Sequence, residues 1–323
     1  MNESITSRHP EPRSGEGSLS RKLEMLRPFG PQHDTVTRRL KRSAAHERFR
    51  RVTDVVMLGL TGLMTLLALV PLVWIIVQVF VRGSSAISIS FLTDTFKPTS
   101  LGGGGVWHAI VGTGILIGLA TLFSVPVGIL AAFYVSEHPN TTLGLAVRFG
   151  TDVLSGLPSI VVGLFVYTLI VSGQGYSALA GSLALAILML PVVLRTTEEM
   201  LKLVPKSLRE ASLALGAPEW KTSFSVLLPA AMTGVVTGLM LAVARVAGET
   251  APLLFTALGS NNLSTALDKP IASLPLVLFK YAVDPNKVRN AQAWAIALLI
   301  LVLVLVLNIA ARLITMWRSK MVQ

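Results

Sequence analysis

The sequence lacks cysteine and is poor in charged residues. With no cysteine among 323 residues, disulfide frameworks, cysteine-based zinc sites and iron–sulfur clusters are excluded. The five histidines never fall at metal-ligand spacing, so no metal site is predicted. Charged residues make up 14%, against 52% for apolar types, whereas soluble domains carry about 25% charged residues. With a mean hydropathy of +0.66, these figures argue against a disordered chain, a coiled coil or an ordinary soluble enzyme, and favour a membrane protein.

A phosphate-binding loop is missing as well. No stretch reads G-x-x-x-x-G-K-[ST], the pattern that holds nucleotide phosphates. The chain is therefore not expected to hydrolyse ATP or to be an enzyme. Gly102–Gly105 is rich in glycine but lacks the lysine. We expect it to be a flexible link, with an anion-binding nest of backbone amides as the alternative.

Long apolar segments predict an all-α membrane protein with six transmembrane helices. A bilayer core of about 30 Å needs roughly 20 apolar helical residues. Because none of the segments alternates between polar and apolar residues, barrel strands are not expected. The predicted spans are Val55–Val81, Trp107–Tyr134, Thr151–Ser172, Ala178–Leu194 (with an extension toward Met200), Ala231–Leu258 and Ala291–Trp317.

Basic residues are distributed unevenly between the two sides of these spans. One side holds 21 Lys and Arg, in residues 1–54, 135–150, 195–230 and after 311, and the other holds 6. The positive-inside rule places the richer side, and both termini, in the cytoplasm. The net charge of +11 is then mainly an orientation signal, and no nucleic-acid partner is expected. We predict two regions: a disordered basic tail over 1–50, with contact to membrane lipid, and a permease domain over 51–317.

The predicted cytoplasmic loop 202–229, named here the coupling loop, is strongly patterned. Ser207–Glu210 fits a capping box, Gly216 suits a left-handed helix end, and Pro218 suits the first position of a second helix along the membrane surface. A plain amphipathic connector would give the same signals. A DNA-binding helix–turn–helix is an alternative, but this loop is held between two predicted spans.

The spacing in this loop resembles the EAA motif of ABC importer permeases. Glu210-Ala211-Ser212 is followed after three residues by Gly216 and after nine more by Val226-Leu227-Leu228-Pro229. Ser212 in place of Ala and Val226 in place of Ile are mild departures. The resemblance implies that Glu210, Ala211, Ser212 and Gly216 belong to a coupling helix that docks on an ATPase.

Two ionisable residues lie inside the fifth predicted span. Arg245 is expected near its middle, with Glu249 one turn later. A central arginine costs about 2.5–3.5 kcal/mol on the lenient insertion scale, and Arg before Glu is the weaker order for a helical ion pair. A water-filled pathway explains the placement better than a self-contained pair. Because a guanidinium suits oxyanions, an anionic substrate follows, with phosphate, sulfate, molybdate and carboxylates left open by these residues alone.

Two further blocks resemble phosphate ABC importer permeases of the PstA type. Arg245–Leu254 reads R-V-A-G-E-T-A-P-L-L and Gly156–Phe165 reads G-L-P-S-I-V-V-G-L-F. The resemblance implies a type I importer permease with the MetI-like fold and a substrate pathway containing Arg245, Glu249 and Thr250.

The same resemblance implies the partners and the location. It implies a multi-pass protein of the bacterial plasma membrane that forms half of a phosphate pathway. The partners implied are a homologous permease (PstC type), an ATPase dimer that uses ATP and Mg (PstB type) and an extracytoplasmic phosphate-binding protein (PstS type). This chain itself would bind no cofactor.

Three alternatives stay open. The first is the same architecture with another oxyanion. The second is an ion-driven secondary transporter, which would predict inverted repeats and broken helices; the sequence has no convincing repeat. The third is a membrane scaffold or sensor, which leaves Arg245 unexplained.

Overall fold

The computed structural model describes residues 44–321. The predicted basic tail lies largely outside these residues, at 1–43, although helix α3 (Ala44–Ser84) begins within its last residues. The chain divides into two units, 1–73 and 74–323, each considered by itself. The first described unit is the apolar body of α3 as far as Val73, which confirms the first predicted span.

The described part of the second unit is helical, with two isolated bridges, Phe96 to Gly104 and Leu258 to Ile271. Its principal helices are α4 (Ile89–Thr93), α5 (Trp107–Glu137), α6 (Thr142–Gly156), α7 (Ser159–Val166), α9 (Ala178–Leu203), α10 (Lys206–Ala214), α11 (Glu219–Thr222), α12 (Leu228–Ala247), α13 (Ala251–Thr256), α14 (Leu274–Ala282) and α15 (Lys287–Met321).

Within residues 44–321, five helices are long and apolar enough to span a bilayer, or six when one bent pair counts as a span. The six-span prediction is confirmed in this form. The fourth span extends through Leu203, in the direction expected. The five single helices are Phe49–Ser84, Trp107–Glu137, Ala178–Leu203, Glu219–Ala247 and Lys287–Ala310.

The third predicted span is not one straight helix. The segment Thr142–Gly156 and the segment Ser159–Gln174 meet at an angle of 106°. Leu157 has an extended backbone at the break, as a residue before proline prefers, and Pro158 opens the next helix. The prediction of a helix over Thr151–Ser172 is therefore wrong at this joint, and much of the predicted loop 135–150 is helix α6.

The fifth predicted span is broken too. Helix α12 ends at Ala247, Gly248–Thr250 separates it from α13, and Pro252 occupies the first turn of α13. At its other end, α12 continues through a π-helical turn (Ser223–Leu227) from α11, so that Glu219–Ala247 is one helical segment. The predicted surface helix after Pro218 is therefore the start of this segment.

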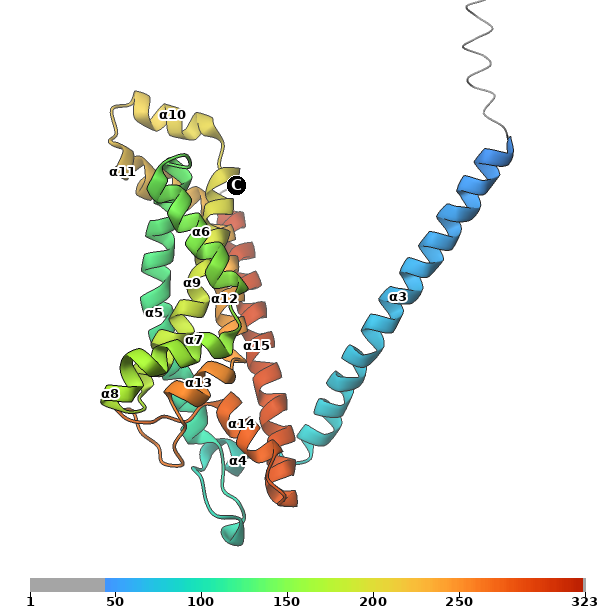
Figure 1. The fold of residues 1–323 in the computed structure, drawn as a ribbon, viewed down its shortest axis with the longest axis vertical. Helices are drawn as coiled ribbons and strands as arrows, with labels where there is room; N and C mark the ends of the chain where they lie inside the picture. The colour runs from blue at the N-terminus through green and yellow to red at the C-terminus, as the bar shows by residue number, and fades with distance from the viewer. Residues whose placement is uncertain (1–43, 322–323) are drawn as a thin grey trace, which may run out of the picture. The chain divides into compact units, whose positions relative to one another are not determined.

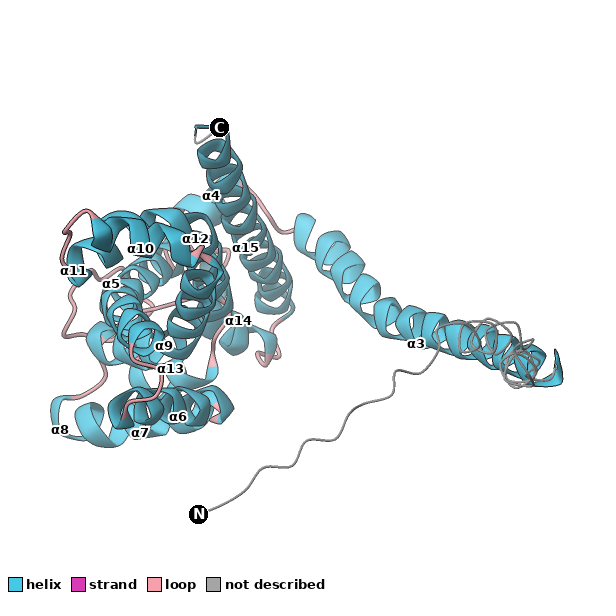
Figure 2. Ribbon diagram, turned by 90° about the horizontal axis from the view of Figure 1, so that it is seen from above, coloured by secondary structure: helices cyan, strands magenta, loops and turns pink. Residues whose placement is uncertain are grey.

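The helices of the second unit form a bundle with two different ends (Figure 1). Figure 1 shows α10 and α11 at one end and α4 and α14 at the other. Figure 2 looks along α5, α9 and α12, which lie next to one another. A buried apolar core runs between these three helices and includes Leu116, Leu185, Met189 and Val243.

Candidate functional site

Arg245 lies in the last turn of α12, not in the middle of a helix. At 1.5 Å per residue, it is about 25 Å along the axis from Leu228. Its side chain is exposed on the isolated chain, and no ion pair or hydrogen bond to it occurs among residues 44–321. Because an unpaired arginine on a membrane-spanning helix is costly in lipid, this guanidinium requires a polar environment outside the single chain.

Glu249 and Thr250 lie in the break that follows Arg245. Both are partly buried, and the Glu249 backbone N–H still donates to the Val246 carbonyl at 3.1 Å. In the described part of the chain, Glu249 does not pair with Arg245, so a self-contained ion pair does not explain either charge. The three predicted pathway residues therefore lie in the last turn of α12 and in the break that follows it.

The short helices after the two breaks meet each other. A Cβ atom at Gly163 of α7 would lie 2.6 Å from the Pro252 Cα of α13, so glycine permits this close approach of two backbones. The Thr256 carbonyl at the end of α13 accepts a hydrogen bond from Ser177 N–H at 3.1 Å. Figure 1 shows α7 and α13 crossing the bundle between its ends. Broken helices, expected of an ion-driven transporter, are thus present in this chain as well.

The coupling loop begins with a helix that starts earlier than predicted. Pro205 is the N-cap of α10, and no side chain caps the helix. The capping box at Ser207–Glu210 is therefore wrong, because these residues already lie inside the first turns. The left-handed end is confirmed: Gly216 has φ +81°, and its N–H donates to the Leu213 carbonyl at 2.9 Å.

The coupling loop presents an exposed, partly apolar surface. Leu215 is 89% exposed and Trp220 is 68% exposed. On α10, Glu210 and Ala211 are exposed, while Ser212 is half-buried. The Ser212 hydroxyl lies 2.9 Å from the Thr222 hydroxyl of α11. This bond ties α10 to α11 and keeps the turn at Gly216 closed.

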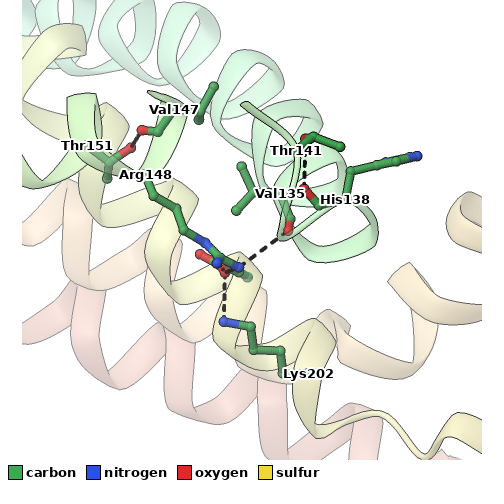
Figure 3. Close-up of polar contacts among 8 residues, drawn as sticks. Val135, His138, Thr141, Val147, Arg148, Thr151 and Lys202 are labelled. Atoms are coloured by element: carbon green, nitrogen blue, oxygen red, sulfur yellow. Dashed lines mark hydrogen bonds and ion pairs between the residues drawn. The ribbon is translucent and has the colours of Figure 1, made fainter. Parts of the chain in front are cut away.

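Sequence reasoning missed an ionic cluster on α6 and α9 (Figure 3). Arg148 donates from Nε and Nη2 to the buried Glu198 carboxylate at 3.1 and 2.6 Å, and Lys202 lies 2.7 Å from the same oxygen. Arg195 pairs with Asp152 beside it. From the sequence, the basic residues of this cluster are interpreted only as an orientation signal, and the four-residue spacing from Glu198 to Lys202 is the one clue to a pair. The cluster fixes α6 against α9.

A second missed residue is Arg289, which organises residues 94–105, named here the glycine loop. Arg289 is 4% exposed. It donates to the carbonyls of Gly103 (3.1 Å) and Lys97 (2.8 Å), and its guanidinium lies over the rings of Phe96 and Tyr281 at 4.6 and 4.4 Å. Gly102–Gly105 is therefore not the flexible link that was predicted.

Two neutral side chains, Tyr281 and Gln292, lie beside Arg289. Burial raises the pKa of the Tyr281 hydroxyl above its ordinary value, an effect that the nearby guanidinium opposes. Gln292 donates to the Gly104 carbonyl at 3.0 Å. The carbonyl oxygens of the glycine loop thus take the place of a carboxylate beside this cation. Elsewhere in residues 44–321, no three His, Asp or Glu side chains gather into a metal site.

Comparisons with known proteins identify similar membrane transport proteins. The family model described as "Binding-protein-dependent transport system inner membrane component" matches residues 124–319. The phosphate transport system permease protein PstA of Yersinia pestis is 45% identical, covering 83% of this chain and 92% of that protein. PstA of Haemophilus influenzae is 43% identical, covering 82% and 94%. PstA 1 of Mycobacterium tuberculosis H37Rv is 40% identical, covering 76% and 82%.

A solved structure shares the fold. A chain of the inward-facing MetNI methionine ABC transporter superposes with a TM-score of 0.52 at 23% identity, covering 65% of this chain and 93% of that chain. At this identity the likeness concerns the fold alone. It agrees with the predicted MetI-like architecture.

Proposed function

The chain belongs to the family of binding-protein-dependent transport system inner membrane components, and we propose that it is a permease subunit of an ATP-driven importer of inorganic phosphate. The observation that carries this proposal is 45% identity to a phosphate transport permease over 92% of that relative's length. Two features support it: Arg245, which is exposed and has no ion pair within residues 44–321, can bind an anion, and the exposed coupling loop can bind an ATPase.

Assembly with other subunits follows from the family. A multi-pass membrane subunit of an ABC transporter works with a second permease, an ATPase and a binding protein. We assign these to a PstC-type permease, a PstB-type ATPase dimer that binds ATP and Mg, and a PstS-type phosphate-binding protein. With 21 of the Lys and Arg residues on the side of the coupling loop, both termini and this loop are cytoplasmic.

In this proposal, Arg245 binds the phosphate as it passes through the membrane. A phosphate that leaves water needs replacement donors, and a guanidinium offers two parallel, charge-assisted N–H groups. Because Arg245 is exposed on the single chain, the pathway runs along this face and is completed by the second permease. The Glu249 carboxylate accepts a hydrogen bond from the hydroxyl of hydrogen phosphate and repels sulfate, which has no such hydroxyl, so it discriminates against sulfate. The Thr250 hydroxyl provides a further donor beside them.

The test is uptake by proteoliposomes that contain the permeases and the ATPase, with the binding protein outside. We expect phosphate uptake that requires ATP. Arg245→Ala should abolish it, and Arg245→Lys, which keeps the charge but loses the paired donors, should reduce it about tenfold. Lys269→Ala is the matched control, because it removes an exposed cation outside the spans, and it should leave uptake unchanged.

Other outcomes identify other functions. Full phosphate uptake by assembled Arg245→Ala would contradict the pathway assignment. ATP-driven uptake of sulfate or molybdate in place of phosphate would support another oxyanion. Uptake driven by a proton or sodium gradient without ATP would support a secondary transporter. In an active Glu249→Gln variant, unchanged exclusion of sulfate would remove only the role of Glu249.

A further inference from the structure

Glu137, the last residue of α5, contacts both arms of the coupling loop. Its Oε1 accepts a hydrogen bond from the Ser223 hydroxyl at 2.6 Å, and its Oε2 lies 3.5 Å from the Arg209 guanidinium. Ser223 opens the π-helical turn after α11, whereas Arg209 is on α10. The Glu137 side chain is 12% exposed and Ser223 is 5% exposed. One sheltered carboxylate therefore joins three segments of the chain.

Apolar contacts bring the same segments together. The rings of Phe133 and Phe224 lie 5.1 Å apart, and Phe133 packs with Leu201 and Leu227 in a small buried cluster. Beside Glu137, however, a cavity of about 180 Å³ is bounded by Arg209 and Pro205 among others. Packing is incomplete on this side, so the bonds of the carboxylate fix the loop where apolar contact does not.

The opposite end of α5 contacts a different part of the chain. The buried Thr113 hydroxyl accepts a hydrogen bond from Leu274 N–H at 2.9 Å and donates to the Ala109 carbonyl at 2.7 Å. A Cβ atom at Gly112 would collide with the Ala272 carbonyl. Helix α5 thus touches the segment that leads into α14, at the end of the bundle far from the coupling loop (Figure 1).

Along its length α5 is held against α9. Gly128 lies so close to Val193 that a Cβ atom there would be 2.8 Å from the valine side chain. The Ser124 hydroxyl lies 3.8 Å from the Met189 sulfur. Because protein interiors are close-packed and transmit strain, a displacement at the Glu137 end is carried along α5 and α9 together.

We propose that Glu137 is a positioning residue that passes movement of the coupling loop into α5, and through α5 to the Ala272–Leu274 segment. The inference rests on the proposed function, because it needs an ATPase that moves the loop. Glu137 itself touches neither substrate nor nucleotide. Without its carboxylate, ATP hydrolysis continues but is no longer matched by transport.

The experiment measures phosphate imported per ATP hydrolysed, in proteoliposomes containing the whole complex. Glu137→Ala should lower this ratio about tenfold, as expected for loss of a hydrogen bond to a charged group, with ATP hydrolysis within about twofold of wild type. Glu137→Gln keeps an acceptor for Ser223 and loses only the ion pair with the partly exposed Arg209, so we expect a change of about twofold. The matched control is Glu199→Gln, an exposed glutamate near the same end, which should leave the ratio unchanged.

A second variant tests the joint from the other side. Ser223→Ala removes one hydroxyl and should lower the ratio about threefold. Combined with Glu137→Ala, it should cause no further loss, because the bond from Ser223 to Glu137 is already absent from Glu137→Ala. An unchanged ratio in Ser223→Ala, or in assembled Glu137→Ala, would overturn the inference. Failure of the wild-type complex to import phosphate with ATP would overturn the proposed function instead.

Discussion

The coupling loop and the glycine loop lie at opposite ends of the bundle and are built in different ways. Both depend on left-handed glycines, with φ +81° at Gly216 and +62° at Gly104. Around Gly216 there is open space, whereas a side chain at Gly104 would collide with the backbone of Lys97 and Thr95. Only the glycine loop is closed by a buried arginine.

The difference shows two ways to hold a loop on a membrane protein. In the glycine loop, Arg289 and Gln292 use carbonyl oxygens as acceptors, so the backbone itself is clamped and little of it is free to move. In the coupling loop, bonds to Glu137 fix the base, while Leu215 and Trp220 stay exposed. The first design favours a fixed shape, and the second leaves a surface free for a partner.

Of the substitutions that test this difference between the two loops, loss of Arg289 should have the largest effect on loop stability. Arg289→Met leaves the buried Gly103 carbonyl and the partly buried Lys97 carbonyl without their donor, so the free energy of local opening of the glycine loop should fall by about 3 kcal/mol. Hydrogen–deuterium exchange of residues 94–105 in nanodiscs measures this fall.

The control for this variant is Arg82→Met. Arg82 is an exposed arginine at the same end whose guanidinium lies 5.1 Å from the Trp294 ring centroid, and its loss should leave exchange in the glycine loop nearly unchanged. Equal protection of the loop in Arg289→Met and wild type would show that the clamp is dispensable.

Substitution of Gly104 should have the next largest effect. Gly104→Ala adds a Cβ atom in a left-handed conformation and against the backbone of Lys97 and Thr95, and we expect a loss of about 2 kcal/mol. The same exchange experiment detects it. Protection as high as in wild type would mean that the loop can refold around a side chain.

Gly216→Ala should have the smallest effect. Its conformation has the same hand, but open space surrounds the added methyl group, so strain alone costs about 1 kcal/mol. Exchange of residues 206–222 measures this cost. A loss larger than that in Gly104→Ala would reverse the order of the two loops.

Transmembrane spans are well predicted from the sequence, because the mean hydropathy of about twenty residues indicates whether a segment lies in lipid or in water. Breaks within spans are predicted less well. Pro158 and the Gly248–Thr250 stretch were visible, but each lies inside an apolar run whose average is unaffected by one turn. A helix start is also a matter of single residues: Pro205 precedes Ser207 by two positions and takes the cap, so the expected capping box never forms.

Side-chain partners were harder to predict than elements. Arg245 is exposed but lies in the last turn of α12, not in the middle of a helix as predicted, and its place on a pathway stays a prediction. The left-handed Gly216 follows from its place after a helix. Arg289 could not be found in this way, because its acceptors are backbone carbonyls more than 180 residues away. Every residue has a backbone carbonyl, so no residue type in the sequence indicates which carbonyl will accept a hydrogen bond from a distant arginine. The Glu137 contacts likewise depend on how α5 ends beside α10.

The π-helical turn at Ser223–Leu227 lies between α11 of the coupling loop and Arg245, within one helical segment. A π turn holds one residue more than the α-helix around it, and each α-helical residue turns the chain by about 100°. Deleting one residue here would let the turn relax into a regular α-helix. The loop would then keep its sequence, its exposed leucine and tryptophan, and nearly its direction relative to the guanidinium, because five π-helical residues and four α-helical residues each complete about one revolution. The turn thus absorbs one residue of length without changing which side of the permease the coupling loop faces.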